Sequence, residues 1–124
     1  MNAKDIVAIV DDEEAVRAGL GSLLRSADLN AALFASAEEF FDQGDLARYS
    51  CVLSDIQMPG ASGIDLLVAI RSARPELPVI LMTAFPDERI RERAASEGAY
   101  RFLVKPCDPD EIIELAERLS EPGL

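Results

Sequence analysis

Short apolar runs alternate with longer segments of mixed polarity along this chain. Five of these runs are too short for typical helices, and most contain β-branched residues, so they predict buried strands. The predicted strands are Ile6 to Val10, Ala31 to Phe34, Cys51 to Leu53, Val79 to Met82 and Phe102 to Val104. Strands that are apolar throughout are typical of a parallel sheet with both faces covered.

The segments between the predicted strands have the apolar spacing of amphipathic helices. Their apolar positions are Val16, Leu20, Leu23 and Leu24; Phe40 and Phe41; Ile64, Leu67 and Val68; Ile90, Ala94 and Ala95; and Ile112, Ile113, Leu115, Ala116 and Leu119. Ser36 and Glu39 form a capping-box pattern, and Asp108 precedes a proline at the first position of the last helix. Gly98 ends the fourth helix. Together these units predict an α/β domain with a doubly wound parallel sheet and helices on both faces.

The composition is typical of one cytoplasmic domain. A chain of 124 residues, 49% of them apolar, can bury a core that needs neither disulfides nor a structural metal. It has no apolar stretch long enough to span a membrane and no pattern of a secretory signal, so we expect a cytoplasmic location. Cys51 and Cys107 are then expected to be free thiols, since the predicted sheet places them at opposite ends.

Charge and residue types exclude several functions. The net charge of -11 opposes direct binding to nucleic acid or to anionic membranes, which attract Lys and Arg. The chain has no histidine. This absence excludes Ser-His and Cys-His nucleophile pairs, His-ligated zinc and a phosphohistidine on this chain.

Polar side chains with chemical potential follow the predicted strands at their carboxyl ends, where open parallel sheets bind ligands. Asp11 and Asp12 follow the first strand, Asp55 the third, Thr83 the fourth and Lys105 the fifth. Taken alone, the acidic run that begins at Asp11 could be the first turn of a helix. Asp55 favours a site instead, because a carboxylate that ends a buried strand is costly to desolvate without compensation.

Clustered carboxylates repel one another, and Mg²⁺ is their usual partner where phosphate is also bound. A phosphoryl group there needs cations and donors around its oxygens, which Mg²⁺, Lys105 and Thr83 would supply. A carboxylate is the predicted nucleophile, because the chain offers no histidine, no cysteine at a strand end and no evident base for a serine. Asp55 is the candidate, since Asp11 and Asp12 are adjacent and better placed to hold the metal.

Four segments at these strand ends resemble the receiver domain of two-component response regulators. They are Val10 to Glu13, Ser54 to Gly60 with Gly63, Met82 to Ala84, and Val104 to Pro106, in the family's order and spacing. The likeness extends from Ile6 to Leu119 and is greatest to receivers of helix-turn-helix transcription regulators, including the nitrogen-fixation type. It implies a flavodoxin-like sheet of order 2-1-3-4-5, with residues 1–120 as the receiver domain and 121–124 as the start of a linker or C-terminal tail.

The resemblance implies an aspartyl-phosphate switch. Asp55 would accept the phosphoryl group, and Thr83 and Lys105 would bind its oxygens. The implied Mg²⁺ ligands are Asp12, Asp55 and the main-chain carbonyl of Gln57, with Asp11 holding the ion through water. In this family the peptide bond between Lys105 and Pro106 is usually cis.

The resemblance also implies how the signal leaves the site. Phe102 falls at the family's switch aromatic, whereas the nearby Tyr100 fits the position less well. Switching alters the face formed by the fourth helix, the fifth strand and the fifth helix. Gln57 and Phe85 lie where the family tunes dephosphorylation. A bulky Phe85 would shield the phosphoryl group from water, whereas Gln57 could orient an attacking water, so the two side chains have opposite expected effects on the phosphate lifetime.

The implied phosphodonor is a sensor histidine kinase. The resemblance is compatible with homodimerisation on phosphorylation, and with a chain that either stands alone or carries an output domain, typically for transcription. We expect no direct contact of this domain with nucleic acid or membrane. It would not be a turnover enzyme, because it would promote only its own phosphorylation and slow autodephosphorylation.

Two other functions stay open at this point. A receiver-like module could bind partners without phosphorylation, although the intact acidic set argues against it. A phosphatase of the haloacid dehalogenase type needs a second aspartate two residues after the nucleophile, and Gln57 stands there. A phosphorylatable receiver is therefore the leading hypothesis.

Overall fold

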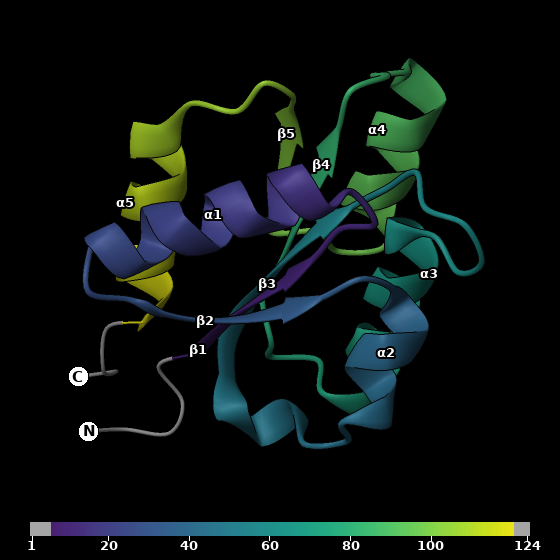
Figure 1. Ribbon diagram of the computed structural model, residues 1–124. Coiled ribbons are helices and arrows are strands. Elements are labelled where there is room, and N and C mark those ends of the chain that lie inside the picture. Colours follow the sequence, from purple (N-terminus) through teal and green to yellow (C-terminus); the bar gives the residue numbers. More distant parts are fainter. Residues whose placement is uncertain (1–5, 121–124) are drawn as a thin grey trace.

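One parallel sheet of five strands organises the protein, in the order β2-β1-β3-β4-β5. The computed structural model describes residues 6–120 (Figure 1), so the predicted linker or tail at 121–124 lies outside the described residues. The strands are β1 (Ile6–Val10), β2 (Asn30–Phe34), β3 (Tyr49–Asp55), β4 (Val79–Thr83) and β5 (Arg101–Val104). The predicted fold class and strand order are confirmed.

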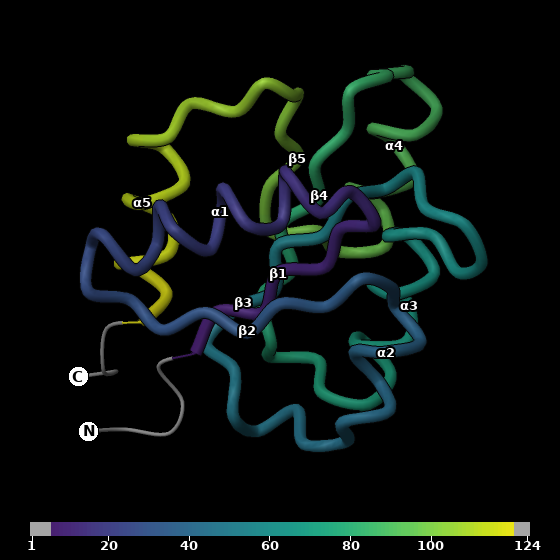
Figure 2. The backbone as a smooth tube through the Cα atoms, in the orientation of Figure 1, coloured from purple at the N-terminus to yellow at the C-terminus, as the bar shows by residue number. Residues whose placement is uncertain are grey.

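Helices cover both faces of this sheet. They are α1 (Glu14–Ser26), α2 (Ala37–Asp42), α3 (Gly63–Ala73), α4 (Glu88–Ser96) and α5 (Pro109–Ser120), with a short 3-10 helix, η1 (Leu46–Arg48), before β3. Helices α1 and α5 lie on one side of the sheet, and α2, α3 and α4 lie on the other (Figures 1 and 2). Within residues 6–120 no helix has the length and apolar character needed to cross a bilayer.

The alternation of side chains along the strands divides the core into two layers. Val7 and Ile9 of β1 pack with Leu24 of α1 and with the buried face of α5. Ala8 and Val10 of the same strand face the layer that contains α2, α3 and α4. Strands with two apolar faces therefore explain the uninterrupted apolar runs of the sequence.

Local signals at the helix ends act largely as predicted. The Ser36 hydroxyl accepts a hydrogen bond from the Glu39 backbone N–H at 3.0 Å, and Gly98 after α4 has a φ of 93°. Helix α3 begins with a full capping box formed by Ser62 and Asp65, which the apolar spacing alone did not reveal. This box fixes the start of α3 directly after the loop that leaves β3.

Candidate functional site

Neighbouring parallel strands bring three carboxylates together. Strands β1 and β3 pair so that Val10 lies opposite Ser54, and Asp11 and Asp55 each follow one of these residues. Oxygen atoms of Asp11, Asp12 and Asp55 lie within 4.8 Å of one another. Asp11 is fully buried and Asp55 is 5% exposed, whereas Asp12 is exposed to solvent.

Lys105 reaches into this cluster from the end of β5. Its Nζ lies 3.0 Å from Oδ2 of Asp11 and 3.2 Å from Oδ1 of Asp55, and the peptide bond to Pro106 is cis. Burial alone would lower the pKa of Lys105, but the hydrogen bond and charge of Asp11, together with Asp55, raise it overall. The ammonium is therefore held in its charged form between two buried carboxylates.

The cluster contains more negative charge than Lys105 can neutralise. Burial raises the pKa of Asp55 above its ordinary value; Lys105 opposes this shift, and the charges of Asp11 and Asp12 add to it. Arg17 contacts the main-chain oxygen of Asp11, at 2.8 Å, rather than its carboxylate. The cluster thus has three carboxylates and one ammonium. Carboxylate oxygens are the ligands that a hard divalent cation such as Mg²⁺ prefers.

Thr83 ends β4 beside these groups, with its side chain completely buried. Its hydroxyl donates a hydrogen bond to Oε1 of Gln57 at 2.7 Å and accepts one from the backbone N–H of Phe85 at 3.0 Å. Gln57 itself is exposed, two residues after Asp55. Sequence reasoning assigned Gln57 only a main-chain role and a place near the attacking water, and it missed the bond between its side chain and Thr83.

The backbone of Asp55 is closely supported by the start of α3. A Cβ atom added to Gly63 would overlap the main-chain oxygen of Asp55, so only glycine allows this approach. The Gly63 N–H donates to the oxygen of Ile56 at 3.0 Å, and the Ala61 N–H donates to Oε2 of Glu38 at 3.0 Å. These contacts fix the loop between β3 and α3 at both of its ends.

The two aromatic candidates for a switch lie on opposite sides of the sheet. Phe102 packs on the side of α4, where the guanidinium of Arg91 lies 4.6 Å from the ring centre. Tyr100 packs on the side of α5. A hollow of about 330 Å³ at the edge of the sheet formed by β5 is lined by residues that include Arg91, Tyr100 and Phe102. Of the two, Phe102 is thus the aromatic that contacts α4.

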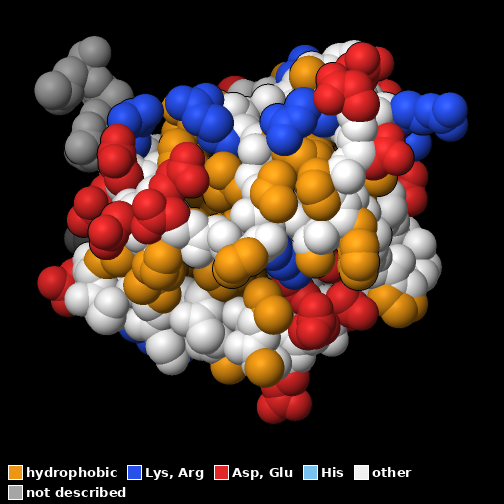
Figure 3. Space-filling view, turned by 90° about the horizontal axis from the view of Figure 1, so that it is seen from above, with side chains coloured by type: hydrophobic (Ala, Val, Ile, Leu, Met, Phe, Trp, Pro, Cys, Tyr) orange, Lys and Arg blue, Asp and Glu red, His pale blue; other side chains and the backbone are white. Residues whose placement is uncertain are grey.

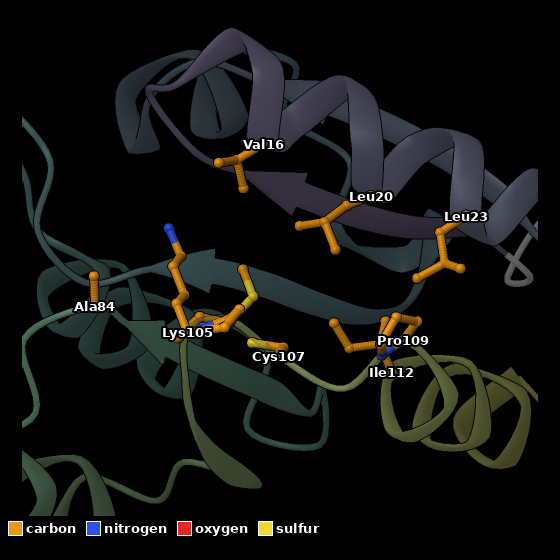
Figure 4. A pocket seen from close by; sticks show the side chains of 10 residues that line it. Val16, Leu20, Leu23, Ala84, Lys105, Cys107, Pro109 and Ile112 are labelled. Atoms are coloured by element: carbon orange, nitrogen blue, oxygen red, sulfur yellow. The ribbon is translucent and has the colours of Figure 1, made fainter.

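A larger apolar cavity lies next to the acidic cluster, between α1 and the segment after β5. Its volume is about 410 Å³, and Figure 4 shows Val16, Leu20 and Leu23 of α1 facing Lys105 and Cys107 across it. Seen from above, acidic side chains lie close to exposed apolar ones (Figure 3). Cys107 and the buried Cys51 are both free thiols, as predicted.

Comparisons with known proteins identify the family of this chain. The sequence model of the response regulator receiver domain matches residues 7–117. The transcriptional regulatory protein FixJ of Bradyrhizobium diazoefficiens is 36% identical over 126 residues, which cover 99% of this chain and 62% of FixJ. The DNA-binding transcriptional regulator NtrC of Klebsiella pneumoniae is 39% identical over 115 residues, which cover 93% of this chain and 24% of NtrC. The chain thus spans less than two-thirds of the length of these relatives.

Solved structures show the same fold. The crystal structure of FixJ-N superposes with a TM-score of 0.83 at 33% identity, covering 96% of this chain and 95% of that one. The BeF3-activated DrrB receiver domain has a TM-score of 0.86 at 24% identity, covering 96% of this chain and 99% of that one. With the family model matching most of the sequence and the strand order of the sheet in agreement, this chain belongs to the response regulator receiver domain family of two-component signal transduction.

Proposed function

We propose that this chain is a phosphorylatable receiver that takes a phosphoryl group onto Asp55 from the phosphohistidine of a sensor histidine kinase. The convergence of Asp11, Asp12, Asp55 and Lys105 at one edge of the sheet, with Thr83 beside them, carries the proposal. A carboxylate oxygen of Asp55 forms the new bond to phosphorus as the N–P bond of the donor breaks. The donor must be another protein, because this chain has no histidine.

Each group around Asp55 has a definite task in this proposal. In this proposal Lys105 would neutralise one phosphoryl oxygen, and the Thr83 hydroxyl would donate a hydrogen bond to another. Asp12, Asp55 and the Gln57 main-chain carbonyl would hold Mg²⁺ directly, with Asp11 acting through water. The ion supplies positive charge that offsets the oxygens of the phosphoryl group.

Phosphorylation of Asp55 would control a transcriptional output through a change in the surface of the receiver. Movement of Thr83 would turn Phe102 inward and alter the face formed by α4, β5 and α5. The matched relatives are transcriptional regulators longer than this chain, so we assign the receiver to residues 1–120 and transcriptional output to a separate domain. The receiver would promote its own phosphorylation and slow dephosphorylation, without turnover of an external substrate. Homodimerisation on phosphorylation is part of the same proposal.

Acetyl phosphate with Mg²⁺ tests the phosphorylation directly, with the intact mass of the protein as the measurement. We expect one added phosphoryl group that hydroxylamine removes, and none in Asp55→Asn. Asp42→Asn is a matched control, because this exposed residue at the end of α2 is not a member of the acidic cluster and should leave phosphorylation unchanged. Absence of the adduct in the wild type, or its persistence in Asp55→Asn, would contradict the proposal.

A further inference from the structure

The Thr83 hydroxyl carries a single proton, and in the unmodified protein this proton forms the hydrogen bond to Gln57. The distance from Oγ1 of Thr83 to Oε1 of Gln57 is 2.7 Å; Thr83 is the last residue of β4, and Gln57 follows the neighbouring strand β3. A hydroxyl accepts more than one hydrogen bond but donates only one. The whole donor capacity of Thr83 is therefore used by the Gln57 carboxamide.

A phosphoryl group on Asp55 would compete for this same proton. Its oxygens only accept hydrogen bonds, so Thr83 can bind one of them only by leaving Oε1 of Gln57. The bond from the Phe85 N–H uses the acceptor side of the Thr83 hydroxyl, so it is compatible with either partner. The two orientations of Thr83 are thus mutually exclusive, and each is defined by the acceptor of one proton.

The backbone around Gln57 is anchored by contacts that do not include Thr83. The loop that carries Gln57 is held by the hydrogen bond from Gly63 to Ile56 and by the one from Ala61 to Glu38. Neither bond involves Thr83. When the hydroxyl donates to the phosphoryl group, its bond to Oε1 of Gln57 is lost, and the two loop contacts do not depend on that bond.

We propose that Gln57 is a positioning residue that holds Thr83 in its unphosphorylated orientation and so restrains activation of the receiver. This inference rests on the proposed function of Asp55 and Thr83. Gln57 is exposed, so water can replace Thr83 as the partner of its carboxamide. Loss of one such bond changes an equilibrium by roughly two- to tenfold, which is the size of the expected effect.

The test is the affinity for beryllofluoride, a phosphoryl mimic, in the presence of Mg²⁺. In Gln57→Leu the acceptor oxygen is absent, and we expect beryllofluoride to bind roughly two- to tenfold more tightly than to the wild type. The backbone amide signals of Thr83 and Phe85 report binding by NMR, and in the ligand-free variant they should already be displaced toward their bound positions. Beryllofluoride binding has no hydrolysis step, so a Gln57 that only oriented an attacking water would leave this affinity unchanged.

A double-mutant cycle shows whether Gln57 acts through Thr83. Thr83→Val removes the hydroxyl at similar volume, so in this background Gln57→Leu should no longer alter the affinity. An equal gain with and without the hydroxyl, or no gain in the single variant, would overturn the restraint by Gln57 while leaving the phosphorylation of Asp55 intact. A wild type that neither binds beryllofluoride nor accepts phosphate would instead overturn the proposed function, and the restraint with it.

Discussion

Asp55 combines burial with a negative charge, and this combination opposes the stability of the folded protein. Burial raises its pKa above the ordinary 3.8, despite the opposing effect of Lys105 and with a further contribution from the charges of Asp11 and Asp12. A carboxyl whose folded pKa is raised binds its proton more tightly in the folded chain than in the unfolded chain. The free energy of unfolding therefore falls as the pH rises through the folded pKa of Asp55.

Asp55→Asn should remove the loss of stability that the charged Asp55 carboxylate causes. Without divalent metal, the variant should therefore be more stable than the wild type at neutral pH. The gain should shrink as the pH falls and vanish below 3.8, where Asp55 is protonated in both states. Urea unfolding in the presence of a chelator, at a series of pH values, measures the difference. Asp42→Asn should show no such gain, and a wild type more stable than Asp55→Asn at neutral pH would contradict the prediction.

Substitution by alanine should change the free energy of unfolding in opposite directions at Gly63 and at Gly19. Gly63→Ala places a Cβ against the Asp55 backbone and should lower the free energy of unfolding by about 1–3 kcal/mol. Gly19 lies in the interior of α1, where an added Cβ would meet no neighbouring side chain within 4 Å, so Gly19→Ala should raise that free energy by about 0.5–1 kcal/mol. Urea unfolding of both variants checks the signs. A Gly63→Ala protein as stable as the wild type would contradict the close contact between Gly63 and the Asp55 backbone.

The site shows which properties of single residues a sequence can reveal. Asp11, Asp55, Thr83 and Lys105 could be predicted to lie together, because each lies at the end of a strand of one parallel sheet. The bond between Gln57 and Thr83 could not be predicted. It depends on the direction of a flexible side chain, which tertiary packing decides and periodicity does not encode.

At the scale of elements, apolar runs located every strand and both ends of β1, but they missed one or both ends of each of the other four strands. The run Cys51 to Leu53 corresponds to β3 (Tyr49–Asp55), which also contains Ser54 and Asp55 in register with β4. Ser54 and Asp55 interrupt the apolar pattern, but their backbone still pairs with β4. Val68 fits the helical spacing of α3 yet is 40% exposed, because the helix buries a narrower stripe than its apolar residues suggest.

One hydrogen bond connects α2 to the loop that follows β3. The carboxylate of Glu38 accepts the Ala61 N–H at 3.0 Å, and this bond lowers the pKa of Glu38 below 4.5. The charged form is thus the one that holds the loop. As the pH falls through the lowered pKa of Glu38, the contact weakens and its contribution to stability is lost.

Glu38→Ala should therefore loosen the loop next to Asp55 without unfolding α2. We expect faster hydrogen exchange at the Ala61 amide in the variant, and in the wild type a relative loss of protection at this amide when the pH falls below 4.5. Glu39→Ala on the same helix is the control, because Ser36 contacts only the backbone of Glu39. Equal exchange at Ala61 in the wild type and in Glu38→Ala would show that the bond does not restrain the loop.

The whole molecule has a net charge of -11, and only its fold turns part of this excess into a site. Asp11 and Asp55 are 44 positions apart in the sequence and meet because β1 and β3 are paired. Without metal, Lys105 lies between them and compensates part of their repulsion. The remaining repulsion is a cost of folding that a bound cation would relieve.

Mg²⁺ should consequently stabilise the folded protein, because the unfolded chain does not hold Asp11, Asp12 and Asp55 together. A ligand that binds only the folded state at 100 times its dissociation constant raises the free energy of unfolding by about 2.7 kcal/mol. Urea unfolding at increasing MgCl2 should show such a rise and approach a logarithmic dependence, whereas NaCl at equal ionic strength only screens charge. Asp12 is the exposed member of the cluster, so Asp12→Asn should keep the fold and lose most of the gain. Equal stabilisation of Asp12→Asn and the wild type by MgCl2 would mean that the ions act on the general surface charge and not at this cluster.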